Sequence, residues 1–357
     1  MRLLYVASRF DYGKPAQGES FEHANFFDTL VRMAGRTIHF DFPTVIRETG
    51  SVGAMNRKLI EVARTHQPDL MFCVLTGDEI RPATLRAVRD AGVISLNWFC
   101  DDHWRFDGFT RRYAPCFDHV VTTADELLAR YRDAGFQHVL LSQWACNPRK
   151  YPRVEAQPQY DVSFVGMAHG RRRRLVAKLQ EAGLRVGVFG SGWNTGRLTH
   201  AGMVRLFAQS RVNLNFSEAS TAAEDGPLQR AVHRMRQAML QCPGLWRLAP
   251  GSALGHVGPR QIKARTFEVP AVGGFLLTQD APCLHEYLTP GKEVAVFDDD
   301  RDLVDRVRYY LDHEDERRAI AQAGHARVLR DHTYALRFRK LFTQIGLAEP
   351  ATPRRAA

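Results

Sequence analysis

The stretch QIKARTFEVPAVGGFLLTQD, residues 261–280, places charged side chains at the start of an apolar run. Glu268 stands near the beginning of that run, and Lys263 and Arg265 precede it within one or two helical turns. A buried carboxylate costs free energy unless another group pairs with it or donates hydrogen bonds to it. Glu268 is therefore either a structural ion-pair partner of Lys263 or Arg265, or a residue whose carboxylate a ligand satisfies.

Two glycine turns further upstream carry groups that suit a phosphate. FVGMAHGRRRR (164–174) has glycines that allow close approach of the backbone, and four arginines that open a helix; VFGSGW (188–193) is a second glycine turn after a strand. Backbone N–H groups, helix N-termini and side-chain cations bind phosphate together. The residues predicted to line a diphosphate pocket are Gly166, Gly170, Gly190, Ser191, Gly192, Lys263 and Arg265. The arginine run has two other interpretations, a solvated helix face or a nucleic-acid patch.

A third reactive group is WFCDDHW (98–104), which follows an expected strand. It holds Asp101, Asp102 and His103, and Asp and His are residue types that deprotonate a hydroxyl as a general base. We predict these three as the catalytic residues. The alternative is structural: one aspartate caps the following helix, and His103 packs beside Trp104. The loop 8–20, with Ser8, Arg9 and Asp11, is the other candidate for substrate contact in this part of the chain.

Short apolar runs alternate with amphipathic segments along the chain, which is typical of a parallel sheet with helices on both faces. The expected strands are 3–7, 37–42, 70–75, 93–99, 119–123, 138–143, 160–166, 184–190, 212–217, 275–278 and 293–297. Ligands of such sheets bind at the carboxyl ends of the strands, where the glycine turns fall. The predicted fold class is α/β, with two Rossmann-like domains facing each other across a cleft.

A break in the alternation at residues 147–160, with three prolines, indicates a linker between the domains. The prediction is an N-terminal acceptor-side domain over 1–150, a linker over 151–159, a C-terminal nucleotide-binding domain over 160–330 with a helical insertion at about 218–258, and a final segment over 331–357. That final segment is expected to hold a helix that crosses back to the first domain, and a tail.

The composition indicates what kind of partner the chain binds and in which compartment it is expected. The chain has 357 residues and a net charge of +10, and residues 166–265 alone carry 16 Lys and Arg against 4 Asp and Glu. This local excess predicts an anionic partner. The chain shows no apolar run of membrane-spanning length and no signal peptide, so the expected location is cytoplasmic. Six scattered cysteines without a CxxC pair favour free thiols over a zinc site or disulfides.

The segment from Gln261 to about Leu341 resembles the C-terminal domain of the CgeB-like glycosyltransferases, which have the two-domain GT-B fold. The resemblance covers roughly residues 160–340 except 219–258. It continues more weakly in the N-terminal half, through NWFCDDHWRF and FDHVVTTADELLARYRDAG. It implies transfer of a sugar from a nucleoside-diphosphate sugar (UDP-, GDP- or dTDP-sugar) to an acceptor hydroxyl, by a hexosyltransferase that requires no metal.

The resemblance also implies roles for single residues. Glu268 occupies the place of a glutamate that accepts hydrogen bonds from the ribose hydroxyls. Lys263, Arg265 and Arg172 become candidates for the diphosphate. Many related retaining enzymes have a second acidic residue eight positions before this glutamate, and here that position holds Arg260. The contacts to the donor sugar and the stereochemical outcome are therefore not specified by the pattern.

The segment 218–258 is longer than the resemblance leads us to expect, and its part 227–241 reads as a basic amphipathic helix. That helix is either a lid over the domain or a peripheral contact with an anionic membrane at its inner face, where a lipid-linked acceptor would be met. Two alternatives to the transferase remain: a sugar-nucleotide epimerase or hydrolase of the same fold, and a non-catalytic nucleotide- or nucleic-acid-binding protein. No nucleic-acid partner is expected, because the arginine run is followed by aliphatic residues and not by stacking rings.

Overall fold

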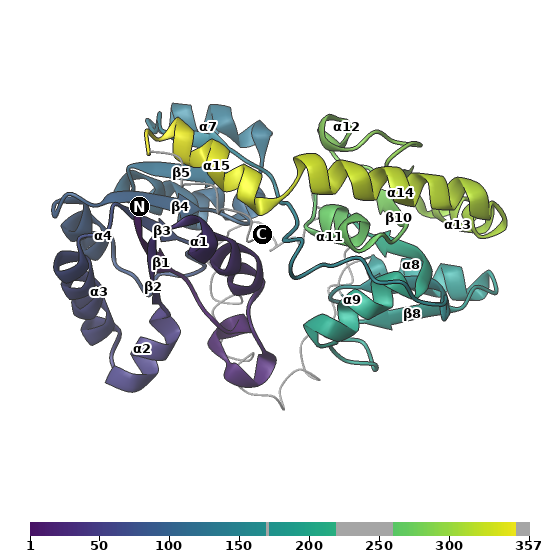
Figure 1. Cartoon of the computed structure of the whole chain (residues 1–357), viewed down its shortest axis with the longest axis horizontal. Helices are drawn as coiled ribbons and strands as arrows, with labels where there is room; N and C mark the ends of the chain where they lie inside the picture. The colour runs from purple at the N-terminus through teal and green to yellow at the C-terminus, as the bar shows by residue number, and fades with distance from the viewer. Residues whose placement is uncertain (169–170, 219–259, 348–357) are drawn as a thin grey trace, which may run out of the picture. The chain divides into compact units, whose positions relative to one another are not determined.

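The chain folds into two compact units, each built around its own parallel sheet (Figure 1). The structure is a computed structural model that describes residues 1–168, 171–218 and 260–347. The first unit comprises Met1–Tyr151 together with the segment from Leu329 onward, and the second comprises Pro152–Val328. The basic helix predicted over 227–241, within the predicted insertion at about 218–258, lies outside the described residues.

The first unit contains a six-stranded sheet in the order β2-β1-β3-β4-β5-β6, in which all neighbours pair in parallel. Its strands are β1 (Arg2–Val6), β2 (Arg36–Phe40), β3 (Leu70–Cys73), β4 (Ile94–Trp98), β5 (His119–Thr122) and β6 (Val139–Leu141). Its helices are α1 (Asp28–Met33), α2 (Phe42–Thr49), α3 (Val52–His66), α4 (Pro82–Arg89), α5 (Asp102–Arg105), α6 (Arg111–Tyr113), α7 (Leu128–Asp133) and α15 (Tyr334–Gln344). A π-helical turn, His23–Phe27, leads into α1.

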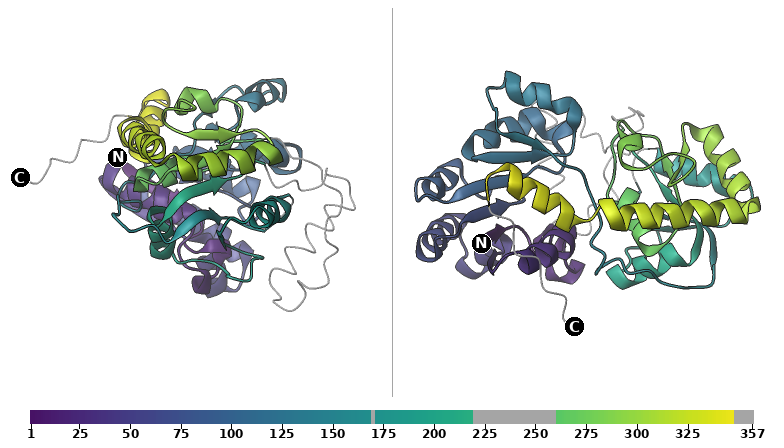
Figure 2. Two further views of the ribbon diagram at one scale, coloured as in Figure 1. Left: turned by 90° about the vertical axis from the view of Figure 1, so that its right-hand side faces the viewer. Right: turned by 45° about the horizontal axis from the view of Figure 1, so that its top comes forward.

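Alternating side chains of these strands bury two different faces, as the period of two in a strand requires. Leu4 and Met71 join the hydrophobic core under α3 and α4. Tyr5 and Phe72 point the other way, into an aromatic layer that Phe26 and Phe338 complete from α1's side and from α15. The last described helix thus packs in the first unit, and α15 contacts α1 directly (Figure 2).

The second unit contains a five-stranded parallel sheet in the order β11-β10-β9-β7-β8. Its strands are β7 (Tyr160–Val165), β8 (Val186–Phe189), β9 (Ser210–Asn215), β10 (Leu276–Gln279) and β11 (Ala295–Phe297). Its helices are α8 (Arg172–Glu181), α9 (His200–Ala208), α11 (Arg265–Val272), α12 (Leu284–Tyr287), α13 (Asp300–Asp312) and α14 (Glu314–Asp331). Leu175 of α8 and Leu303 of α13 pack with Leu214 and Leu277 on one face of this sheet.

These two parallel α/β sheets confirm the predicted fold class, and each of the eleven expected strands is present. The strand prediction ran on to residue 42, whereas α2 begins at Phe42, has Pro43 in its first turn, and ends at Gly50 with left-handed dihedrals. Among the described residues the cysteines are free thiols, and no helix there combines the length and the apolar character that crossing a membrane demands.

Candidate functional site

Helix α11 carries Glu268, which is fully buried at 0% exposure. Arg265, one turn earlier in the same helix, forms an ion pair with its carboxylate. The Arg265 side chain is 25% exposed, and its guanidinium lies 5.7 Å from the ring centre of Phe207. The structural pairing that the sequence allowed for Glu268 is therefore present, and the exposed part of Arg265 is what this pair offers to a ligand.

The two glycines after α11 hold this helix against the sheet. Gly273 ends the helix with a left-handed φ of 89°, a conformation that suits glycine. A Cβ on Gly274 would lie 3.0 Å from both the Phe207 carbonyl oxygen and the Asn213 side-chain nitrogen. A side chain at residue 274 would therefore require these neighbours to shift, so Gly274 allows the close packing of the turn after α11 against α9 and β9.

The glycine turns after β7 and β8 pack directly on each other. Gly190 has a φ of 134°, and a Cβ there would lie 2.3 Å from the carbonyl oxygen of Gly166. The N–H of Gly166 donates to Phe189 O at 2.9 Å, the N–H of Gly190 donates to Gly196 O at 2.7 Å, and the N–H of Ala168 donates to Ser191 O at 2.9 Å. These amides are engaged inside the protein, so Gly166 and Gly190 serve the close approach of two backbones.

The arginines that open α8 have different surroundings. Arg172 is half-buried; its Nη1 donates to Met167 O at 3.2 Å, and its guanidinium lies over the ring of Phe164. Burial lowers the pKa of Arg172 to about 10, an effect that the charge of Glu218 opposes. Arg173 donates to Gly192 O and lies over Trp193, so it ties α8 to the second glycine turn. The predicted contact Gly170 lies outside the described residues.

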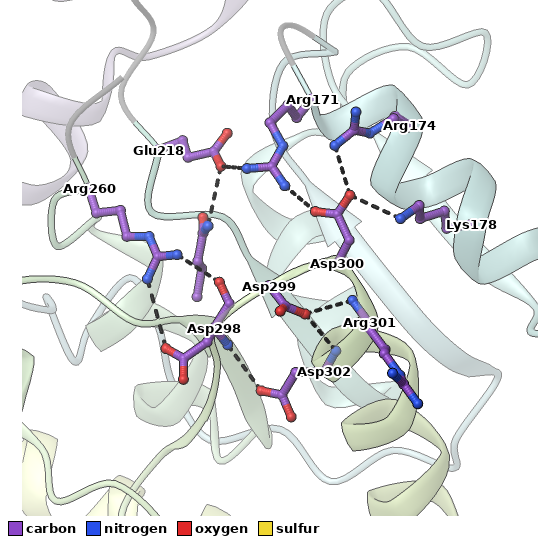
Figure 3. Close-up of polar contacts among 11 residues, drawn as sticks. Arg171, Arg174, Lys178, Glu218, Arg260, Asp298, Asp299, Asp300, Arg301 and Asp302 are labelled. Carbon is purple, nitrogen blue, oxygen red and sulfur yellow. Dashed lines mark hydrogen bonds and ion pairs between the residues drawn. The ribbon is translucent and has the colours of Figure 1, made fainter. Parts of the chain in front are cut away.

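A network of ion pairs joins the start of α8 to the start of α13 (Figure 3). The Asp300 carboxylate pairs with Arg171, with Arg174 at 2.8 Å and with Lys178 at 3.1 Å. Burial raises the pKa of Asp300, but the hydrogen bond from Lys178 and the nearby arginines outweigh this and hold it below its ordinary value. Asp300 is thus an ionised anchor for these cations.

Glu218, just after β9, is a buried acid that the sequence analysis did not single out. It is 7% exposed, and its Oε1 accepts from Arg171 at 2.9 Å and from the side-chain amide of Gln279 at 3.2 Å. It also forms an antiparallel bridge with Arg260, the residue found where related enzymes have an acid. Arg260 itself turns to Asp298, donating to its carbonyl oxygen at 2.7 Å (Figure 3). A strand-end residue followed by a long insertion gave no motif from which Glu218 could be found.

In the first unit, Asp102 is the most enclosed of the three predicted catalytic residues. Asp102 is 2% exposed, and it accepts hydrogen bonds from Thr110 at 2.8 Å and from the Tyr131 hydroxyl at 2.6 Å. Burial raises the pKa of Asp102 to about 6, although these hydroxyl donors lower it. A carboxylate enclosed in this way braces α5 against its neighbours, and its catalytic role stays a prediction. Asp101 and His103 are half-buried at the start of α5.

Glu22 is the second acid that the sequence analysis missed, because it lies in a segment that reads as an ordinary helix. It follows the loop after β1, next to the π-helical turn. Burial raises the pKa of Glu22 to about 7; its own backbone N–H lowers it, and the charges of Asp11 and Asp101 raise it further. Glu22, Asp11 and Asp101 therefore form one acidic group at the carboxyl ends of β1 and β4. A carboxylate with a pKa near 7 suits a general base.

No group of three or more His, Cys, Asp and Glu side chains is arranged to hold a metal ion within residues 1–168, 171–218 and 260–347. Among the described residues, the polar groups assembled in the second unit include cations, amides and the carboxylates of Glu218, Glu268 and Asp300. Arginines and helix ends of this kind bind phosphate oxygens, whereas carboxylates and amides bind hydroxyl groups. The second unit thus has the chemistry of a site for a phosphorylated, hydroxyl-rich ligand.

Comparison with solved structures defines the class to which this two-sheet fold belongs. HepE from Anabaena, solved in complex with UDP-glucose, is similar with a TM-score of 0.61 and 11% identity, over 97% of this chain and 100% of that one. Sucrose-phosphate synthase from Thermosynechococcus elongatus is similar with a TM-score of 0.58 and 11% identity, over 97% of this chain and 99% of that one. The fold is that of the GT-B glycosyltransferases.

The sequence comparisons agree with this fold. Residues 171–343 match the family described as glycosyl transferase-like. The chain is also a distant relative of the spore protein CgeB of Bacillus subtilis, with 20% identity over 272 residues that cover 75% of this chain and 80% of that protein. The resemblance to the CgeB-like proteins is confirmed, and residues 171–343 form a glycosyl transferase-like domain by this match.

Proposed function

We propose that the chain transfers a hexose from a UDP-sugar to an acceptor hydroxyl, through an oxocarbenium-like transition state. The observation that carries the proposal is the buried Glu268–Arg265 pair of α11, inside the region that matches the glycosyl transferase-like family. HepE, which shares the fold, binds UDP-glucose, and this supports UDP among the UDP-, GDP- and dTDP-sugars expected from the sequence.

Each half of the donor has assigned residues in this proposal. Glu268 accepts hydrogen bonds from the ribose hydroxyls while it holds Arg265 in place. Arg265, Lys263 and Arg172 take the diphosphate, together with the backbone around Ser191 and Gly192. Positive charge fixed in advance stabilises the departing diphosphate without reorganisation at the moment of reaction. The reaction then needs no metal ion.

In this proposal the first unit binds the acceptor and supplies the general base that deprotonates its hydroxyl group. The candidates are the predicted residues Asp101, Asp102 and His103, and in addition Glu22. The acceptor is a hydroxyl of a glycan, a lipid-linked saccharide, a protein or a small molecule, and the enzyme works in the cytoplasm. The segment 227–241 is either a lid over the second domain or a contact with the inner face of the membrane, where a basic amphipathic helix would bind anionic lipid.

Thermal unfolding with UDP, GDP, dTDP and CMP tests the donor site. A ligand at about 100 times its Kd stabilises the folded state by roughly 2.7 kcal/mol. We expect UDP to raise the Tm of the wild type and of Glu286→Gln, an exposed control in α12. In Glu268→Gln the shift should be largely lost. No shift with any nucleotide would leave Glu268 as a structural carboxylate and would refute the proposal.

Product analysis separates the transferase from the alternatives of the same fold. An epimerase or a hydrolase consumes the nucleotide sugar without an acceptor, whereas a transferase releases nucleoside diphosphate fastest when the acceptor is present. A non-catalytic protein would bind nucleotide and turn nothing over, and a nucleic-acid-binding protein would bind oligonucleotides with a steep dependence on salt.

A further inference from the structure

The carboxyl ends of β9 and β10 carry a buried polar pair, Glu218 and Gln279, that the roles proposed above leave unused. Glu218 is 7% exposed and Gln279 is 2% exposed. The side-chain amide nitrogen of Gln279 donates to Glu218 Oε1 at 3.2 Å. Because a carboxylate can only accept, this bond fixes which end of the Gln279 amide faces Glu218.

That orientation leaves the amide oxygen of Gln279 as a buried acceptor with no hydrogen-bond partner among the described residues. Buried polar atoms in proteins are nearly always hydrogen-bonded, and one without a partner calls for an explanation. Glu218 adds a second acceptor, since both of its bonds within the described parts of the chain go to Oε1 and leave Oε2 available. Two adjacent acceptors at a strand end match a pair of hydroxyl donors.

The cations near Glu218 and Gln279 indicate that the ligand carries a phosphate in addition to its hydroxyl groups. Arg171 bridges Glu218 and Asp300, so it fixes the orientation of the Glu218 carboxylate (Figure 3). Arg172, the next residue, is assigned to the diphosphate, and its Nε is a buried donor without a partner among the described residues. Acceptors for hydroxyl groups therefore lie next to donors for an anion. A sugar joined to a phosphate presents both.

We propose that Glu218 and Gln279 bind hydroxyl groups of the transferred sugar and so determine which sugar the enzyme accepts, with Arg171 as a positioning residue. This inference rests on the proposed function, and it assigns the glycosyl half of the donor where Glu268 and Arg265 take the nucleotide half. Glu218 follows β9 and pairs with Arg260 through an antiparallel β-bridge. It therefore places a carboxylate beside the position where the resemblance leads us to expect an acidic residue.

The test compares the affinity for a nucleoside diphosphate with that for its sugar derivative. Isothermal titration calorimetry of the full chain with UDP and UDP-glucose, and in parallel with GDP and GDP-mannose, gives Kd for wild type, Glu218→Gln and Gln279→Met. Asp298→Asn is the matched control, because Asp298 is an exposed carboxylate at the same sheet edge that pairs with Arg260. Far-ultraviolet circular dichroism and Tm verify that each variant is folded.

We expect both variants to bind the nucleotide sugar at least tenfold more weakly than the wild type, while the Kd of the nucleoside diphosphate changes less than twofold. Asp298→Asn should bind both ligands as the wild type does. Equal weakening of both ligands, or no weakening of either, overturns the inference and leaves the proposed function intact. A wild type that binds neither ligand of either pair overturns the proposed function, and this inference with it.

Discussion

The acidic group of Glu22, Asp11 and Asp101 has a consequence for the pH dependence of the reaction. Burial and the two neighbouring charges raise the pKa of Glu22 to about 7. If Glu22 is the base, only its deprotonated form accepts the proton of the acceptor hydroxyl. We therefore expect kcat to rise with pH and to level off above about 7. Glu22→Gln should lower kcat roughly 10²- to 10⁴-fold, the usual contribution of a general base.

Asp101→Asn is the control that separates Asp101 from Glu22 as candidate bases. The charge of Asp101 raises the pKa of Glu22, so its removal should shift the rising limb of the kcat profile to lower pH and leave the plateau largely unchanged. If instead Asp101→Asn abolishes turnover and Glu22→Gln retains the wild-type profile, Asp101 is the base. Steady-state kinetics from pH 5 to pH 9 with saturating donor distinguishes these outcomes.

Residues of the candidate site could be predicted from the sequence only where they belong to a recognisable local motif. Glu268 stood out because a carboxylate interrupts an apolar run before two glycines. Glu218 and Glu22 did not, because their surroundings are built by residues distant in the sequence, such as Gln279 for Glu218. Asp102 was assigned to catalysis by its motif, yet Thr110 and Tyr131 enclose it, and no spacing within WFCDDHW reveals that enclosure.

Among the secondary-structure elements, the strands were predicted from the sequence more accurately than the starts of the helices. Parallel strands are buried on both faces, so they read as short apolar runs, and each of the eleven was found. Helix α2 was missed because Phe42 belongs equally to an apolar strand pattern and to a helix with proline in its first turn. The turns after β7 and β8 were recognised by their glycines, but their role in packing two backbones required coordinates.

Those turns allow a prediction about stability. In Gly190→Ala the new Cβ would lie 2.3 Å from the Gly166 carbonyl oxygen, at a φ of 134°. Backbone strain and the clash together should lower the free energy of unfolding by about 3 kcal/mol, since each strained position alone costs about 1–3 kcal/mol. Urea denaturation, followed by far-ultraviolet circular dichroism, measures the loss.

The matched control is Gly183→Ala, after α8. Gly183 also has a positive φ, 81°, but a Cβ there would meet no atom within 4 Å. Gly183→Ala should lower the free energy of unfolding only through dihedral strain, by about 1 kcal/mol. Equal losses for the two variants would show that close approach of the β7 and β8 turns contributes nothing, and that glycine is needed at residue 190 only for its dihedral angles.

At the scale of the whole molecule, the chain passes from the first unit to the second and then returns. Helix α14 lies across the boundary at Val328, and α15 belongs to the first unit. Tyr334 and Phe338 of α15 are fully buried there. The backbone of Cys146 also bonds to this returning segment, through Cys146 N to His332 O at 3.0 Å and Tyr334 N to Cys146 O at 3.0 Å. The first unit is thus assembled from both ends of the described chain.

The stability of the first unit should therefore depend on its last helix. The ring of Phe338 lies 5.4 Å from that of Phe26, 5.5 Å from that of Phe72 and 6.2 Å from that of Trp98, centre to centre. Phe338→Ala removes the centre of this aromatic layer and should lower the free energy of unfolding by about 3–5 kcal/mol. Hydrogen exchange read by mass spectrometry should show faster exchange in β1, β3 and β4 and unchanged protection in β7 and β9.

Phe275→Ala provides the reciprocal measurement in the second unit. Phe275 is also buried, with its ring 4.8 Å from that of Tyr310, so the two variants remove the same atoms from different cores. Phe275→Ala should speed exchange in β9 and β10 and spare β1 and β3. If Phe338→Ala instead exposes β7 and β9 as much as β1, the two units unfold as one cooperative body, because α15 would then stabilise both sheets together.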